Sequence, residues 1–238
     1  VLVLAVGEGT KLIEYIMGAD KEYEATLEFG KTSDTYDSEG QVVETGAPMP
    51  SREQIEAALP QFRGEIQQVP PVFSALKING QRAYDLARRG EKVELKSRQV
   101  HIRDLTLLDC QNETAKLHIH CSSGTYIRSI VHDLGQVLGC GAIMIGLRRS
   151  RVGQFALQQA TEISLENLLP LEQIVAGWPT IKINTNEMLE LHQGKKVHVG
   201  GEPPHTDTIF AILHNDKLVG LAELSRGFLT PVKNFVLK

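Results

Sequence analysis

The sequence predicts an α+β protein followed by a second, smaller β-rich domain. Up to about residue 177, segments of alternating polar and apolar residues, typical of half-buried strands, are interleaved with short amphipathic helical segments. Beyond Gly177-Trp178-Pro179, roughly 60 residues of short strands with one helix indicate a small barrel. We therefore expect two domains, residues 1–177 and 178–238.

The first elements follow from local patterns. The apolar run VLVLAVG predicts a buried strand over residues 1–6, after which the chain turns into a short helix that ends at Gly18. Residues 21–29 alternate again, with Tyr23 on the apolar face, where a core or rim aromatic is also a sufficient reading. Ser51 and Gln54 fit a capping box, which predicts a helix that begins there.

The next segment is punctuated by Pro and Gly and is rich in positive charge. Pro70-Pro71 interrupts regular structure, Asn79-Gly80 favours a turn, and Arg82 to Arg89 predict a short basic helix. Residues 77–103 contain eight basic and three acidic side chains, although the whole chain has a net charge of −4. Because local basic density sets the attraction for phosphates, this segment is typical of a mobile element that closes over an anionic ligand. The alternative is a solvated charged surface.

The centre of the chain passes from strands to an amphipathic helix. Residues 98–109 and 114–121 predict two strands, and Thr125 is a candidate N-cap for the helix that follows. Arg128 then lies in the first helical turn, where a cation opposes the helix dipole, so we expect an acidic partner. An arginine on the surface with a local carboxylate is the simpler alternative.

The remaining elements are shorter. We expect strands at 142–149 and 152–157, a helix over 164–176 capped by Ser164, and a hairpin turn at His214-Asn215-Asp216. A further helix at 185–193 and the short strands near 195–199, 208–213, 217–224 and 230–237 make up the second domain. The chain has three cysteines without metal-ligand spacing, which indicates buried thiols in a reducing cytosol. These residue patterns alone do not define an enzyme.

Five longer motifs resemble, in order and form, those of TruB-type tRNA pseudouridine synthases. They are GEGTKL (7–12), DKEYEATLEFGKTSDTYDSEG (20–40), PPVFSALKINGQRAYDLARRG (70–90), CSSGTYIRSIVHDLG (121–135) and GAIMIGLRRSRVG (141–153). The resemblance implies a pseudouridine synthase fold, with a mixed or antiparallel central sheet flanked by helices and a C-terminal PUA barrel that binds RNA. It also implies isomerisation of uridine 55 in the T arm of tRNA, by base flipping and an aspartate nucleophile, without metal or cofactor.

The resemblance also implies roles for particular residues. Arg128 would be the partner of the nucleophilic aspartate, and Tyr23 would stack on the extruded base and assist proton removal. Residues 70–96 would include the insertion that grips the T stem-loop, and the PUA domain would bind the acceptor end. The residues expected to bind substrate are Lys11, Tyr126, Leu147, Lys77, Tyr84, Arg88, Arg89, Arg148 and Arg149. The protein would be a cytoplasmic monomer without a membrane segment.

One expected motif is not in the sequence. The family's aspartate lies in a Gly-His-x-Gly-x-Leu-Asp-Pro motif, whereas Asp20, Asp34 and Asp37 belong to the next motif and its loop. Because residue 1 is an apolar valine and not Met, we expect that the motif precedes it and that residues 1–238 alone are inactive. Two alternatives stay open: a non-catalytic module that binds or folds tRNA, and an RNA-guided relative in a ribonucleoprotein. The long insertion favours the stand-alone enzyme over the latter.

Overall fold

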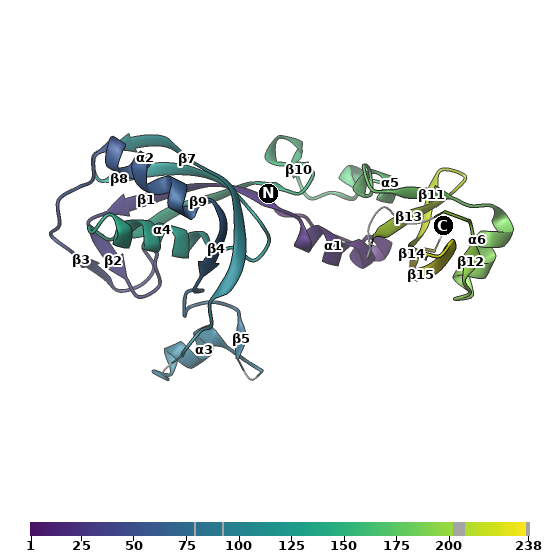
Figure 1. Cartoon of the computed structure of the whole chain (residues 1–238), viewed down its shortest axis with the longest axis horizontal. Coiled ribbons are helices and arrows are strands. Elements are labelled where there is room, and N and C mark those ends of the chain that lie inside the picture. Colours follow the sequence, from purple (N-terminus) through teal and green to yellow (C-terminus); the bar gives the residue numbers. More distant parts are fainter. Residues whose placement is uncertain (79, 92, 202–207, 237–238) are drawn as a thin grey trace. The chain divides into compact units, whose positions relative to one another are not determined.

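The computed structural model describes residues 1–78, 80–91, 93–201 and 208–236. The chain forms two compact units (Figure 1), one of Val1–Val3 and Tyr15–Ala160 and the other of Leu4–Glu14 and Thr161–Lys238. Each unit has its own cluster of buried apolar side chains. Asn79 of the predicted turn and Lys92 of the basic segment lie outside the described residues.

The first unit is built on a six-stranded antiparallel sheet, which confirms the expected α+β class. In spatial order its strands are β10 (Phe155–Ala156), β9 (Ala142–Val152), β1 (Lys21–Phe29), β8 (Thr114–Cys121), β7 (Arg98–Gln111) and β4 (Gly64–Gln68). The alternating pattern of β1 buries Ala25, Leu27 and Phe29 on one face. Tyr23 follows the same alternation, opposite Ile119 of β8 and Arg149 of β9.

Helices cover this apolar face. They are α2 (Arg52–Ala58), a 3-10 helix (Leu59–Phe62) and α4 (Ile127–Val137), whose apolar side chains join those of the sheet in one core. Ser51 caps α2 with the predicted capping box. In α4, Ile127, Ile130, Val131 and Leu134 are at most 4% exposed, because their helical spacing places them on the stripe that faces the sheet. This packing fixes the position of Arg128, which the same helix carries.

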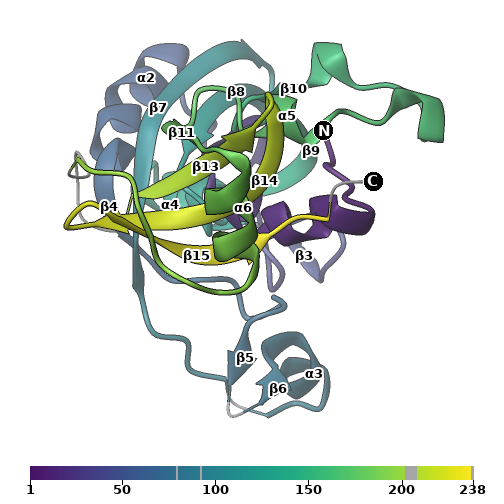
Figure 2. The ribbon, with the colours of Figure 1, turned by 90° about the vertical axis from the view of Figure 1, so that its right-hand side faces the viewer.

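The basic segment forms a small excursion from the first unit. It contains β5 (Lys77–Ile78), β6 (Gln81–Arg82) and α3 (Ala83–Arg88), so the predicted short basic helix is confirmed. Figures 1 and 2 both show it projecting from the sheet on the two segments that join β4 to β7. A second pair of short strands, β2 (Lys31–Ser33) and β3 (Val42–Glu44), brackets the loop of residues 34–41.

The second unit contains a small curled sheet (Figure 2). Its strands are, in spatial order, β11 (Thr180–Lys182), β13 (Ile209–His214), β14 (Lys217–Ser225), β15 (Phe228–Asn234) and β12 (Val197–His198). The helices are α6 (Thr185–His192), α5 (Leu171–Ile174) and two 3-10 helices, Gly7–Leu12 and Leu165–Asn167. Asn215 and Asp216 both have positive φ, as the predicted hairpin turn between β13 and β14 requires. Helix α1 (Ile13–Gly18) and the 3-10 helix Leu157–Gln159 complete the elements.

Three local predictions are wrong. Residues 1–6 are extended without strand pairing, and Leu2, Leu4 and Val6 are more than half exposed, so their apolar character does not reflect burial here. The helix predicted over 164–176 is split into two short pieces, because Pro170 restricts its predecessor and lacks the N–H that a continuous helix needs.

The third concerns the start of α4. Its N-cap residue is Tyr126 and not Thr125, whose hydroxyl instead donates to the Ser122 carbonyl.

Candidate functional site

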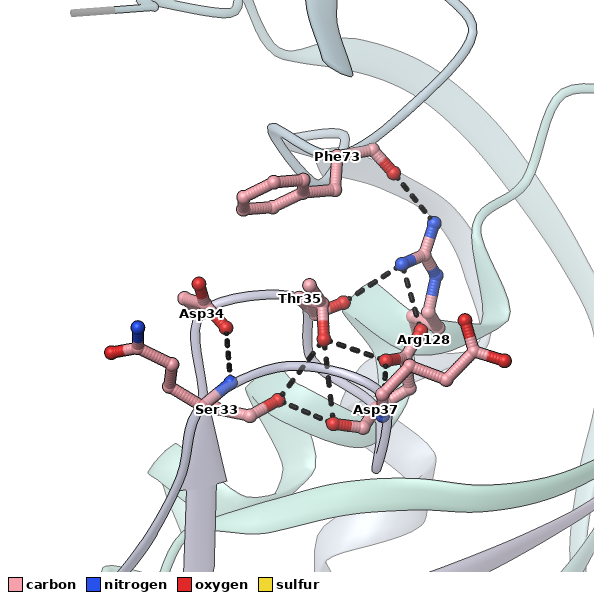
Figure 3. Close-up of polar contacts among 8 residues, drawn as sticks. Ser33, Asp34, Thr35, Asp37, Phe73 and Arg128 are labelled. Carbon is pink, nitrogen blue, oxygen red and sulfur yellow. Dashed lines mark hydrogen bonds and ion pairs between the residues drawn. The ribbon is translucent and has the colours of Figure 1, made fainter. Parts of the chain in front are cut away.

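Arg128 is held by three acceptors from two other segments (Figure 3). Its Nη1 donates to the Asp37 carboxylate and to the Thr35 carbonyl, both at 2.9 Å, and its Nη2 donates to the Phe73 carbonyl at 2.8 Å. The pair is partly buried, since the side chains of Arg128 and Asp37 are 22% and 14% exposed. These bonds use three of the five guanidinium N–H donors and leave two for a further acceptor.

The predicted acidic partner is therefore present, but in a place that the sequence analysis excluded. Asp37 supplies the carboxylate from a loop 91 residues earlier in the chain, so within residues 1–238 Arg128 already has an acidic partner that is not the family's motif aspartate. The reason is the bridge between Asp37 and Met144 of β9, which brings the loop after β2 alongside the sheet and next to α4. The carboxylate is distant in sequence and the ion pair is partly buried, which rules out the alternative of a surface arginine with a local carboxylate.

The Asp37 carboxylate is itself nearly filled with donors. The Thr35 hydroxyl donates to Oδ1 at 2.6 Å and the Glu39 amide to the same oxygen at 3.0 Å, while Arg128 occupies Oδ2. The Ser33 hydroxyl fixes the Asp37 carbonyl at 2.6 Å. A carboxylate with these contacts is oriented and charge-neutralised, which suits a residue that positions a cation and not one that attacks a substrate.

The first turn of α4 is fixed from a second side, by the chain that leaves β4. Gln68, only 1% exposed, donates to the Tyr126 carbonyl at 3.0 Å and accepts from the Tyr126 amide at 2.8 Å. The buried Ser129 hydroxyl donates to the Val69 carbonyl at 2.8 Å. Because a buried amide with both ends satisfied has a single favourable orientation, Gln68 fixes the position of the Tyr126 backbone.

A cavity of about 920 Å³ opens beside this pair. It brings together four of the predicted site residues, Arg128, Tyr126, Tyr84 and Arg88, and Asp34 and Asp37 also line it. Lys77 and Arg89 line a neighbouring cavity of about 730 Å³, which shares Arg88 with the first. A concave site lined by tyrosines, cations and backbone polar groups can bind a planar polar ring that is attached to anionic groups.

Tyr23 lies on the sheet among other predicted residues. It packs against the same core as the apolar stripe of α4 and is hydrogen-bonded by Arg149. Burial raises the pKa of its phenol, an effect that the Arg149 guanidinium opposes. Farther along β9, Arg148 is paired with Glu24 and Leu147 with Ala25, and Leu147 is 47% exposed. The Val1 carbonyl accepts a hydrogen bond from Arg149 Nε at 2.8 Å, so this end of the chain lies beside the same strand.

Lys11 has its contacts within the second unit. Its ammonium donates to Glu8 and to the Asn234 carbonyl, both at 2.7 Å, and lies 5.7 Å from the centre of the Phe235 ring. Lys11 therefore does not line the cavity beside Arg128.

Sequence reasoning missed Asp37, Gln68 and the carbonyls of Thr35 and Phe73. The sequence indicated that Arg128 needs an acidic partner. Which residue provides it depends on how distant segments pair in the fold. Gln68 is buried, which is uncommon for glutamine, and in the sequence only its place just before Val69-Pro70-Pro71 sets it apart.

Two further features of the described residues bear on the site. Among them, no group of three His, Cys, Asp or Glu side chains is placed to hold a metal ion. Within the same ranges, every helix is too short or too polar to cross a bilayer.

The fold and the site together define a class: an α+β protein that presents a fixed arginine–aspartate pair in a cavity beside a cationic excursion. The family model described as "TruB family pseudouridylate synthase (N terminal domain)" matches residues 1–127, and "tRNA pseudouridylate synthase B C-terminal domain" matches residues 128–176. This chain belongs to the TruB family of pseudouridylate synthases.

Individual relatives agree with this assignment. The chain is 39% identical to the tRNA pseudouridine synthase B of Pseudomonas putida over 94% of its length and 78% of that protein's. It is 38% identical to the tRNA pseudouridine synthase B of Caulobacter vibrioides, over its whole length and 83% of the relative's. Among solved structures, a chain of an H/ACA RNP bound to a substrate RNA has a TM-score of 0.71 at 20% identity, covering 98% of this chain and 71% of that one. A chain of a Cbf5-Nop10-Gar1 complex has a TM-score of 0.70 at 22% identity, covering 97% and 70%. These structures share the fold.

Proposed function

We propose that this protein is a tRNA pseudouridine synthase that isomerises a uridine of the T arm, at position 55. The observation that carries the proposal is the match, over nearly the whole chain, to relatives named tRNA pseudouridine synthase B. In the reaction the bond from C1′ to N1 breaks, the base turns, and a bond from C1′ to C5 forms. C5 loses a proton and N1 gains one, so the reaction needs no oxidant, reductant or cofactor.

In this proposal Arg128 holds the aspartate that attacks the nucleotide. Its two remaining N–H donors suit a second carboxylate, while Asp37, Thr35 and Phe73 fix the plane of the guanidinium. Because Asp37 is already committed to donors, we propose that it positions Arg128 and does not replace the nucleophile. Residues 1–238 alone would then bind RNA without turnover, since the family's aspartate motif is not among them.

Aromatic side chains would receive the flipped base. Extruding a uridine costs a few kcal/mol, which stacking on tyrosine offsets by roughly 1–3 kcal/mol per base. We assign Tyr23 to stacking, because burial raises the pKa of its phenol and leaves very little phenolate near neutral pH to accept a proton. Tyr126 and Leu147 would complete the pocket wall. Lys11 would also contact the substrate, for which it would have to leave Glu8 and the Asn234 carbonyl.

The RNA backbone would be bound by the cationic surface. The insertion, residues 70–96, would grip the T stem-loop through Lys77, Tyr84, Arg88 and Arg89, which line two adjoining cavities. Arg148 and Arg149 of β9 would contact phosphates beside Tyr23. We further propose a catalytic domain of residues 1–177, a PUA domain of residues 178–238 that binds the acceptor end, and action as a cytoplasmic monomer.

The experiment is an assay for pseudouridine on a T-arm stem-loop RNA, read by mass shift after cyanoethylation or by carbodiimide labelling. The protein expressed from the whole gene is expected to convert the single uridine at position 55, and an RNA with cytidine at that position is the control. Absence of product with this protein would refute the proposed activity. A requirement for an added guide RNA would assign the protein to a guided class instead.

The inactivity of residues 1–238 has its own test. This chain is expected to bind the stem-loop but to give no product, while the protein from the whole gene gives both. Turnover by residues 1–238 alone would show that a carboxylate within them acts as nucleophile, and Asp34, Asp37 and Glu39 line the cavity beside Arg128.

A further inference from the structure

Tyr36 and His132 form a stacked pair next to the site that no step above uses. Their ring centroids are 3.8 Å apart and the ring planes are inclined by 15°. Tyr36 lies in the loop of residues 34–41, and His132 lies on α4, one helical turn after Arg128. Residues four apart on a helix share a face, so α4 meets the loop at two successive points.

The backbone of Tyr36 is placed between the two groups that hold Arg128. The preceding residue, Thr35, offers its carbonyl to the guanidinium, and the following residue, Asp37, offers its carboxylate. Tyr36 itself has φ of +65°, a left-handed conformation that a bulky residue rarely adopts without compensating contacts. Its carbonyl accepts from the Met144 amide at 3.0 Å, and the Ser38 amide donates to the Met144 carbonyl at 3.1 Å. The side chain of this strained residue stacks on His132.

The imidazole behaves as an aromatic surface in this contact. Its Nδ1 is buried without a hydrogen-bond partner among the described residues. Burial also lowers the pKa of His132, which keeps the ring neutral near pH 7. Burial raises the pKa of the Tyr36 phenol, and the charge of Asp133 raises it further. A buried nitrogen without a partner costs stability, so what favours the imidazole at this place is the stacking of its ring face on Tyr36.

We propose that the Tyr36–His132 stack is a positioning device: it holds the turn from Thr35 to Asp37 in its left-handed form and thereby aims the Arg128 guanidinium into the cavity. Tyr36 and His132 are positioning residues that act through Arg128. The proposal rests on the proposed function for its effect on turnover, while its effect on the loop is independent of any activity.

Two pairs of variants separate stacking from hydrogen bonding. His132→Phe and Tyr36→Phe keep the rings and remove the polar atoms, whereas His132→Ala and Tyr36→Ala remove the stack. Gln136→Ala, at an exposed position of the same helix, is the matched control. With T-arm RNA and the protein from the whole gene, loss of the stack is expected to lower kcat about tenfold, with KM within about threefold. The phenylalanine variants and the control are expected to remain within about twofold of the parent.

A second readout needs no activity. Hydrogen exchange of the amides of Ser38, Glu39 and Met144, which hold the loop to Asp37 and to β9, is expected to accelerate about tenfold in His132→Ala and to be restored in His132→Phe. Parental exchange in His132→Ala would overturn the proposal, as would a His132→Phe variant as defective as His132→Ala. If the parent modifies no RNA but the exchange pattern appears, the positioning device stands and the proposed function fails.

Discussion

At the scale of single residues, the site depends on the geometry of one guanidinium. Arg128 lies in the first turn of α4, where its charge opposes the helix dipole, and it is nevertheless fixed by three acceptors. Two of the acceptors are carbonyls, so charge neutralisation by Asp37 is only part of what holds it. The planar fork reaches the three acceptors from two nitrogens, whereas the donors of lysine all leave from one nitrogen.

Replacing the fork while keeping the charge tests this argument. Arg128→Lys is expected to lower the free energy of unfolding by about 2 kcal/mol, because at least one carbonyl loses its donor in a partly buried place, and to lower kcat at least 100-fold. Arg52→Lys, in an exposed pair with Glu56, is the matched control and should change stability by less than about 0.5 kcal/mol. Chemical denaturation and single-turnover kinetics measure the two effects. Equal behaviour of the two variants would contradict a role for the fork.

A buried thiol provides a pH test. Cys121 is fully buried, and burial raises the pKa of its thiol from 9.0 to about 11. The folded state therefore retains a proton that the unfolded chain releases, so this contribution to stability is complete below pH 9 and is lost as the pH rises toward 11. Between pH 8 and 10.5, urea denaturation should show a decrease that is about 2 kcal/mol larger in the parent than in Cys121→Ala. The same decrease in both proteins would exclude this thiol as its source.

The residue scale is also where sequence reasoning ends. The amphipathic stripe of α4 and the position of Arg128 in its first turn follow from local spacing, and both are observed. That Asp37 is the partner does not follow, because a pairing across 91 residues depends on which strands become neighbours. Gln68 and the Phe73 carbonyl are equally distant in sequence, at 58 and 55 residues from their partners.

At the scale of elements, the approach of α4 to β9 sets the position of the site. A Cβ added at Gly135 would lie 2.2 Å from the Ala142 backbone nitrogen and 2.5 Å from the Gly141 carbonyl carbon. Gly135 therefore lets the helix contact backbone directly, and no movement of a flexible side chain can relieve the overlap. In an unconstrained helix, alanine would instead stabilise by roughly 0.5–1 kcal/mol.

We therefore predict that Gly135→Ala is destabilising. The helix must move away from β9, which is expected to cost about 2 kcal/mol or more and to shift Arg128 with it. Gln136→Ala, one residue along and exposed, should leave stability within about 0.5 kcal/mol. Thermal unfolding and the conversion of T-arm RNA test both variants. A Gly135→Ala protein as stable as the parent would show that the helix can be accommodated elsewhere.

Elements with a strong hydrophobic periodicity were predictable from the sequence. Elements whose extent depends on one proline, or on a partner strand elsewhere in the chain, were less predictable. The strands near residues 21–29 and 114–121 and the capped helix that follows Ser51 are where their patterns place them. Residues 1–6 carry an equally apolar pattern but lack a pairing strand, and Pro170 divides a segment whose periodicity alone would give one helix. Hydrophobic pattern thus identifies an element only where the rest of the fold supplies its partner.

At the scale of the whole molecule, charge is segregated in a way that the net value conceals. The chain carries a net charge of −4, yet the excursion of the first unit lines two adjoining cavities with Lys77, Arg82, Arg88 and Arg89. Arg88 also lies 5.5 Å from the Tyr84 ring centre, so a cation and an aromatic face are presented together. An acidic protein with this local surface should avoid anions in general but bind a polyanion that matches it.

The dependence of RNA binding on salt measures that surface directly. Each phosphate contact that is lost lowers the slope of log Kobs against log salt by about 0.7–0.9. Arg88→Gln with Arg89→Gln is therefore expected to weaken T-arm RNA binding and to reduce the slope by about 1.5, whereas Arg52→Gln, exposed on α2, should leave the slope unchanged. Glutamine stays polar but is shorter than arginine, and the same replacement at Arg52 controls for the lost length, so the difference between the variants reports the charge of the excursion. Filter binding between 50 and 300 mM salt, roughly the range in which counterion release is linear, measures both. An unchanged slope in the double variant would move the RNA contact away from the excursion and onto another part of the protein, with Arg148 and Arg149 as the next residues to neutralise.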